Sequence, residues 1–151
     1  MERGALSISL SVLLVLFIIQ FLTGIVMNLL ITFPTNLFPS RGGSLTATFS
    51  YILTGGNLFL TTHFIIDTII IAVGAINLAL VIHKSNSYKI LSLVSLIFVV
   101  SAFINGARFV ASNFAINGIS FGMAAAFLVS FILYFIMAIV MYREIAVQVK
   151  P

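Results

Sequence analysis

Four long apolar stretches alternate with short polar segments along the chain. They cover residues 8–33, 60–82, 90–111 and 119–142, and each reaches the roughly 20 residues that a helix needs to cross the hydrocarbon core of a bilayer. Each stretch is apolar on every side, whereas a strand of a membrane barrel would alternate apolar and polar positions over about ten residues. The pattern predicts an all-α fold, an integral membrane four-helix bundle that forms a single transmembrane domain over residues 1–151.

One long loop, residues 34–59, separates the first two stretches. Pro34 ends the first stretch, and glycines and prolines follow it in a turn-rich segment. Residues 44–54 alternate like a strand but also fit a short helix, and periodicity does not decide between the two. A lone strand at the lipid boundary would leave backbone groups unpaired, so the sequence favours a surface or re-entrant helix there.

The basic residues predict how the bundle is oriented. If the four stretches alternate in direction, five basic residues fall on one side and only Arg41 falls in the loops of the other. The five are Arg3, Lys84, Lys89, Arg143 and Lys150. Because Lys and Arg concentrate in cytoplasmic loops, we expect a multi-pass protein of the cell membrane with both termini in the cytoplasm and the long loop outside.

Composition removes several classes of function. Hydrophobic residues make up 62% of the chain, and its seven Lys or Arg residues form no basic stripe, so nucleic acid is not an expected partner. The absence of cysteine excludes disulfides and thiolate metal sites. No P-loop, dinucleotide fingerprint, zinc-protease motif or nucleophile elbow is present. We therefore expect the protein not to be an enzyme.

Small residues recur at helical spacing in the third and fourth stretches. They are Ala102 and Gly106 in the third, and Gly118, Gly122, Ala126 and Ser130 in the fourth. Such a stripe lets a neighbouring helix approach closely. The stripe could pack the bundle internally, or it could form an interface with a second copy or a partner subunit; a chain of four spans needs internal seams in either case.

Polar side chains inside the stretches gather at one depth, near the ends that flank the long loop. The set consists of Asn28, His63, Asp67, Asn105, Arg108 and Ser120. His63 and Asp67 are four residues apart, so they share one face of a helix. Within the four apolar stretches, Asp67 is the one acidic residue and Arg108 the one basic residue. An isolated charge in the hydrocarbon region of a bilayer costs free energy. We therefore expect Asp67 and Arg108 to form an ion pair.

Two interpretations of this polar cluster stay open. It could hold the helices together as a satisfied ion pair with amide and imidazole partners. It could instead form a proton or ion relay, or a pocket for the polar head of a quinone, a lipid or a similar ligand. A quinone-binding or haem-binding redox or proton-coupled protein would use His63, Asp67 and Arg108 in this way.

A haem places a stricter demand on the sequence. His63 and His83 lie about 30 Å apart along one helix, so they are not the two axial ligands of one haem. A haem would need His63 together with Met27 or Met123, or with a second subunit. Apart from that case we expect no metal and no cofactor.

Short motifs along the chain resemble those of small, uncharacterised four-span membrane proteins of bacteria and archaea. The residues that carry the resemblance are Gly24, Asn28 and Leu29, Pro34, His63, the run Asn105-Gly106-Ala107, and Ser120, Phe121, Met123 and Ala124. The resemblance implies the architecture and no activity. The leading expectation is a non-enzymatic membrane subunit or interaction protein that contacts the lipid bilayer and either other membrane subunits or itself.

Overall fold

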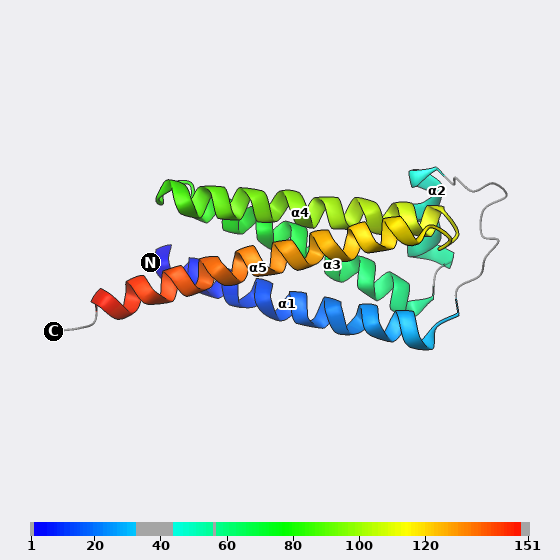
Figure 1. The fold of residues 1–151 in the computed structure, drawn as a ribbon, viewed down its shortest axis with the longest axis horizontal. Helices are drawn as coiled ribbons and strands as arrows, with labels where there is room; N and C mark the ends of the chain where they lie inside the picture. The colour runs from blue at the N-terminus through cyan, green and yellow to red at the C-terminus, as the bar shows by residue number, and fades with distance from the viewer. Residues whose placement is uncertain (1, 33–43, 56, 149–151) are drawn as a thin grey trace.

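The computed structural model describes residues 2–32, 44–55 and 57–148, and this part of the chain is helical (Figure 1). Its elements in chain order are α1 (Glu2–Leu30), α2 (Leu45–Ser50), the π-helical turn η1 (Tyr51–Gly55), α3 (Leu58–Leu80), α4 (Asn86–Ala111) and α5 (Asn117–Gln148). The start of α1 and the end of α5 lie together at one end of the bundle, and α2 lies at the other (Figure 1). We refer to these as the terminal end and the α2 end.

The four long helices, α1, α3, α4 and α5, are long and apolar enough to cross a membrane, as the apolar stretches predicted. Their bounds differ from the prediction at several ends. Helix α1 begins at Glu2 and stops at Leu30, before Pro34, which lies outside the described residues. Helix α5 continues to Gln148. Large apolar side chains point outward along the bundle, among them Ile18, Ile97 and Phe121, the last 77% exposed, which suits a surface that meets lipid.

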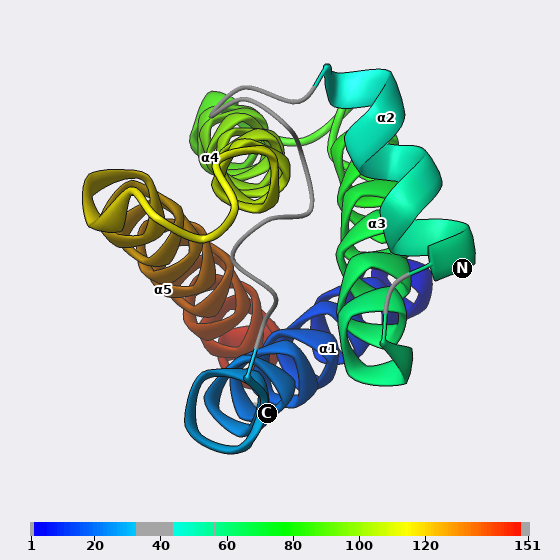
Figure 2. The same ribbon diagram turned by 90° about the vertical axis from the view of Figure 1, so that its right-hand side faces the viewer.

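Residues 45–54, which by sequence could form either a strand or a helix, are helical. Ser44 caps α2, because its side chain accepts a hydrogen bond from the backbone N–H of Ala47. The chain then widens into the π-helical turn η1, and Thr61 of α3 donates a hydrogen bond to the carbonyl of Ile52, 2.7 Å away. Viewed from the α2 end, α2 and η1 lie beside the ends of α3 and α4 (Figure 2).

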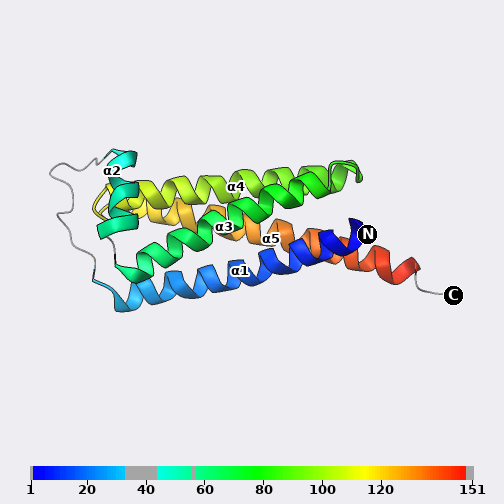
Figure 3. The same cartoon turned by 180° about the vertical axis from the view of Figure 1, so that it is seen from behind.

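The tightest packing lies toward the terminal end. Its largest fully buried side chains come from three helices: Leu10, Leu13 and Phe17 of α1, Ile70 of α3, and Tyr134 and Met137 of α5. The ring of Phe17 lies 4.9 Å from that of Phe127 and 5.9 Å from that of Tyr134. Helix α3 crosses the bundle obliquely from α1 to α4 (Figure 3), so it contributes to this core along most of its length.

Two sets of buried hydrogen bonds join the helices within this core. The side chain of Asn77 in α3 donates to Ser9 of α1 at 3.3 Å and accepts from Ser92 of α4 at 3.0 Å. Between α4 and α5, the hydroxyl of Ser130 donates to the carbonyl of Ser95 at 3.0 Å. These residues are fully or almost fully buried, so each bond replaces water that the interior excludes.

The predicted stripe of small residues packs only in part. Ala102, Ala126 and Ser130 are buried, and a Cβ added at Gly106 would lie 3.2 Å from the sulfur of Met123. Gly122 has looser surroundings, since its added Cβ would meet the amide nitrogen of Asn105 at 3.9 Å. Gly118 was expected in the seam but is exposed, with nothing within 4 Å of an added Cβ, because it lies in the first turn of α5.

Among the described glycines, the one with the least space for a Cβ is Gly74, which the stripe did not include. A Cβ at Gly74 of α3 would lie 2.9 Å from the hydroxyl oxygen of Tyr134 and 3.1 Å from a methyl carbon of Leu96. Gly74 therefore lets α3 pack against both α4 and α5.

A candidate ligand cavity at the α2 end

A cavity of about 360 Å³ lies between the helices near the α2 end and is partly open to the surface. Helix α1 diverges from α4 toward this end (Figures 1 and 3), and residues of all four long helices, together with Ile52 of η1 and Phe114, line the space between them. A volume of this size is in the range that small-molecule sites occupy.

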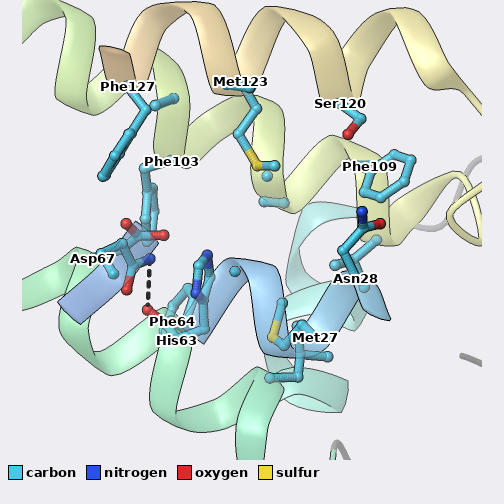
Figure 4. Close-up of a pocket in the computed structure, with 18 of the residues that line it drawn as sticks. Met27, Asn28, His63, Phe64, Asp67, Phe103, Phe109, Ser120, Met123 and Phe127 are labelled. Carbon is cyan, nitrogen blue, oxygen red and sulfur yellow. Dashed lines mark hydrogen bonds between the residues drawn. The ribbon is translucent and has the colours of Figure 1, made fainter. Parts of the chain in front are cut away.

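Four of the six residues of the predicted polar cluster line the cavity. They are Asn28, His63, Asp67 and Ser120. Figure 4 shows His63 and Asp67 on the same side of the cavity, and Asn28 and Ser120 displaced from them toward its far end. The spacing of His63 and Asp67 thus places both side chains at one cavity wall, as their helical periodicity predicted.

Helix α1 fixes the imidazole of His63. The hydroxyl of Thr23 lies 2.9 Å from Nδ1 of His63 and donates its hydrogen to the carbonyl of Gln20, also 2.9 Å away. A hydroxyl has one hydrogen, so with that hydrogen on the Gln20 carbonyl, Nδ1 is the donor to Thr23. In the neutral imidazole this leaves Nε2 as an acceptor, and Nε2 makes no hydrogen bond within the described part of the chain.

The side chain of Gln20 connects the two polar residues of this wall. Its amide nitrogen donates to the backbone carbonyl of His63 at 3.1 Å (Figure 4), and the Gln20 side chain also interacts with the carboxylate of Asp67. Gln20 is 2% exposed, and its amide oxygen has no hydrogen-bond partner among the described residues. Sequence reasoning missed Gln20 and Thr23, although a glutamine inside an apolar stretch was a signal of a buried polar site.

The expected ion pair between Asp67 and Arg108 is wrong. Asp67 lines the cavity, whereas Arg108 is exposed and does not line it. Within the described residues the polar side chain that interacts with the Asp67 carboxylate is that of Gln20. Arg108 lies in the last turn of α4, where a long side chain can extend outward to water and a cation interacts favourably with the helix end.

Asn105, the remaining member of the cluster, does not line the cavity. Its amide nitrogen lies beside Gly122 of α5. Matching positions along the helices therefore indicated four residues that share one cavity. The same positions gave no information about the direction in which α4 presents Asn105 and Arg108.

The remaining walls are apolar and largely aromatic. They include Phe21, Phe64, Phe103, Phe109, Phe114 and Phe127, together with Met27 and Met123. Phe64 and Phe103 are in contact, with ring centroids 5.1 Å apart. Two glycines leave room beside polarisable or polar groups: an added Cβ at Gly24 would lie 3.4 Å from Cε1 of His63, and Gly106 faces the sulfur of Met123.

A strained turn closes the cavity next to α4. Asn113 and Phe114 both have left-handed backbone conformations, with φ of 56° and 59°. This conformation is common for asparagine but rare for phenylalanine. The ring of Phe114 packs edge-on against Phe109 at 5.5 Å, so the turn places an aromatic side chain at the cavity wall.

The fold and the cavity define the class of this protein as a bundle of four helices apolar enough to cross a membrane, with a largely aromatic cavity at one end. Comparisons of the chain with protein-family models, with curated proteins and with solved structures gave no match. Among the described residues, no group of three or more His, Cys, Asp and Glu side chains is placed to hold a metal ion.

Proposed function

We propose that this protein is a multi-pass membrane protein that binds a lipid-soluble organic molecule in the cavity at the α2 end. The observation that carries the proposal is the contrast between the cavity walls. Six phenylalanines and two methionines line it, while His63, Asp67 and Gln20 form a compact polar wall in which Gln20 donates a hydrogen bond to the backbone carbonyl of His63. Sites for small molecules combine apolar walls with a few fixed polar groups in this way.

The arrangement supports binding over a purely structural role for the polar residues. Interhelical polar residues that only hold a bundle together satisfy one another, as Asn77 does with Ser9 and Ser92. Nε2 of His63 has no such partner in the described part of the chain. Asp67 lies on a cavity wall whose other described residues include no Lys or Arg.

We further infer that the bundle lies in the cell membrane with both ends in the cytoplasm and the α2 end toward the outside. The support is the distribution of Lys and Arg, which favours the terminal end for the cytoplasmic side. A ligand in the cavity would then be held in the outer half of the bilayer, where a lipid-soluble molecule partitions.

The proposal is tested by what the protein carries when it is purified in a mild detergent. Native mass spectrometry of the wild type should show a bound mass, and organic extraction should release it. His63→Ala should lose the mass, whereas His83→Ala, the matched change at an exposed position of the α3–α4 turn, should keep it. The wild type would contradict the proposal if it carried no bound or exchangeable small molecule. If other membrane proteins were attached to it instead, the result would support a function as a subunit of a membrane complex.

The same preparation tests haem and quinone as occupants. His63, Met27 and Met123 all line the cavity, so the residues that a haem would require are brought to one space. A Soret band that disappears in His63→Ala would identify haem as the ligand. A bound mass and ultraviolet spectrum of a quinone would identify the second class.

A further inference from the structure

We propose that the cavity selects ligands whose polar group is a protonated amine attached to an apolar body. This inference rests on the proposed function and specifies the chemistry of its ligand. It follows from three features of the cavity: the polar wall exposes acceptors, the lining contains a carboxylate without a cation, and the remaining wall presents aromatic faces.

The polar wall offers hydrogen-bond acceptors to a ligand. The hydrogen of Nδ1 in His63 is used on Thr23, which leaves a lone pair on Nε2. The amide nitrogen of Gln20 donates to the carbonyl of His63, and the Gln20 side chain interacts with Asp67. The carboxylate of Asp67 has two oxygens, each able to accept more than one bond. A ligand group that binds here must therefore donate hydrogen bonds, which an ammonium group does up to three times.

The charge of the lining favours a positive ligand. No Lys or Arg occurs among the described residues that line the cavity, and Arg108 is exposed elsewhere on α4. An opposite charge stabilises the ionised form of a carboxyl group that lies away from water. The unpartnered amide oxygen of Gln20 is buried next to Asp67, so it does not contact a ligand, but its negative partial charge strengthens the preference for a cation.

The aromatic wall adds to this preference. The faces of aromatic rings carry negative electrostatic potential and attract ammonium groups. Phe103 and Phe64 lie near Asp67 and His63, and Phe127 faces the same space from α5 (Figure 4). The rings also supply the apolar surface that the body of the ligand would contact. A neutral donor such as a quinol would use the acceptors but not the charge.

The experiment compares three probes that share one apolar body. Titration calorimetry on the wild type in detergent would measure 4-phenylbutylamine, 4-phenyl-1-butanol and 4-phenylbutyrate at neutral pH, where the amine is protonated. We expect the amine to bind at least roughly tenfold more tightly than the alcohol, and the carboxylate not to bind. Because this comparison uses the wild type, it does not depend on whether a variant folds.

Variants then assign the preference to Asp67. Asp67→Asn keeps the size and an acceptor for Gln20, so it should reduce the affinity for the amine to that for the alcohol. Glu144→Gln is the matched control, since Glu144 is an exposed acid at the terminal end, and it should leave all affinities unchanged.

Two outcomes overturn the inference in distinguishable ways. If the alcohol binds as tightly as the amine, or if Asp67→Asn binds the amine like the wild type, the cationic preference is wrong but the cavity is still a ligand site. If no probe binds and the purified protein carries no small molecule, both the inference and the proposed function fail.

Discussion

Thr23 of α1 and His63 of α3 meet at 2.9 Å between a hydroxyl oxygen and Nδ1, and this contact determines which imidazole nitrogen is left for a ligand. The chain contains two histidines, so each can be assigned in a ¹⁵N-histidine-labelled sample. We expect two-bond ¹H–¹⁵N correlations at neutral pH to show His63 with its proton on Nδ1, because Thr23 already donates its own hydrogen to Gln20.

Thr23→Val tests the same contact, since it keeps the shape of the side chain and removes the hydroxyl. His63 should then show a mixture of tautomers, and ligand affinity should fall severalfold because the ring is no longer oriented. Thr62→Val, at an exposed position next to His63, is the control. A spectrum in which wild-type His63 carries both protons at neutral pH would contradict the assignment of Nε2 as an acceptor.

Gly74 should be the glycine least tolerant of a methyl group. In Gly74→Ala the new Cβ would lie 2.9 Å from the hydroxyl oxygen of Tyr134, which is fully buried and has little room to move. We expect a loss of about 1–3 kcal/mol in the free energy of unfolding, measured by reversible denaturation in mixed micelles.

Two further variants identify the cause of that loss. Tyr134→Phe removes the oxygen that Gly74→Ala would meet, and this oxygen has no hydrogen-bond partner among the described residues, so the double variant should recover most of the stability. Gly118→Ala has open space around its Cβ and should be neutral or slightly stabilising. Equal losses at Gly74 and Gly118 would show that helix propensity, and not the contact with Tyr134, sets the effect.

Asn77 should contribute to stability through its bonds to two other helices. Asn77→Ala leaves the hydroxyls of Ser9 and Ser92 without their buried partner. Hydrogen bonds between membrane helices contribute about 0.6–2 kcal/mol each, so we expect a total loss of roughly 1–3 kcal/mol. Asn86→Ala at the exposed start of α4 is the matched control. A double-mutant cycle with Ser92→Ala should show coupling, and strict additivity would argue against the bond.

The number and kind of long helices could be predicted from the sequence because apolar length alone determines them. Their ends could not. The first apolar stretch begins at residue 8, whereas α1 begins at Glu2, because a helix tolerates serines whose hydroxyls bond within the bundle, as Ser9 does with Asn77. The π-helical turn at residues 51–55 also left no periodic signal in so short a segment.

The candidate site could be predicted only where two residues share a helix. His63 and Asp67 line one wall because a separation of four residues fixes their relative direction. Asp67 and Arg108 lie on different helices, and a helix that is apolar on all sides gives no indication of which face points inward. The position of a residue along the bundle was therefore readable from the sequence, while the rotation of α4 about its own axis was not.

Cysteine labelling should place the α2 end outside the cell. The chain has no cysteine of its own, so single replacements give signal without background. We expect Thr46→Cys in α2 to react in intact cells with a thiol reagent that does not cross membranes, because positive charge concentrates at the opposite end. Ser85→Cys, in the turn before α4, should react only after the cells are permeabilised. The reverse pattern would invert the orientation.

Removing the charges of Asp67 and Arg108 should have independent effects. Asp67 lies at the cavity wall beside Gln20, and Arg108 is exposed in the last turn of α4. Arg108→Gln should change the free energy of unfolding by no more than about 0.5 kcal/mol, as is usual for surface positions. Asp67→Asn should leave stability unchanged or raise it, because asparagine can still accept the hydrogen bond of Gln20 and no longer brings a charge into apolar surroundings.

The double variant distinguishes this arrangement from an ion pair. Two residues without a shared contact should give additive effects within about 0.3–0.5 kcal/mol, whereas breaking a buried pair from one side alone should be costly and removing both partners much less so. Ligand affinity measured on the same four proteins should fall with Asp67→Asn, with or without Arg108→Gln. Coupling above roughly 1 kcal/mol would mean that the Arg108 side chain reaches Asp67 in the membrane. The carboxylate would then have a cation of its own, and the cavity would have no need of a positively charged ligand.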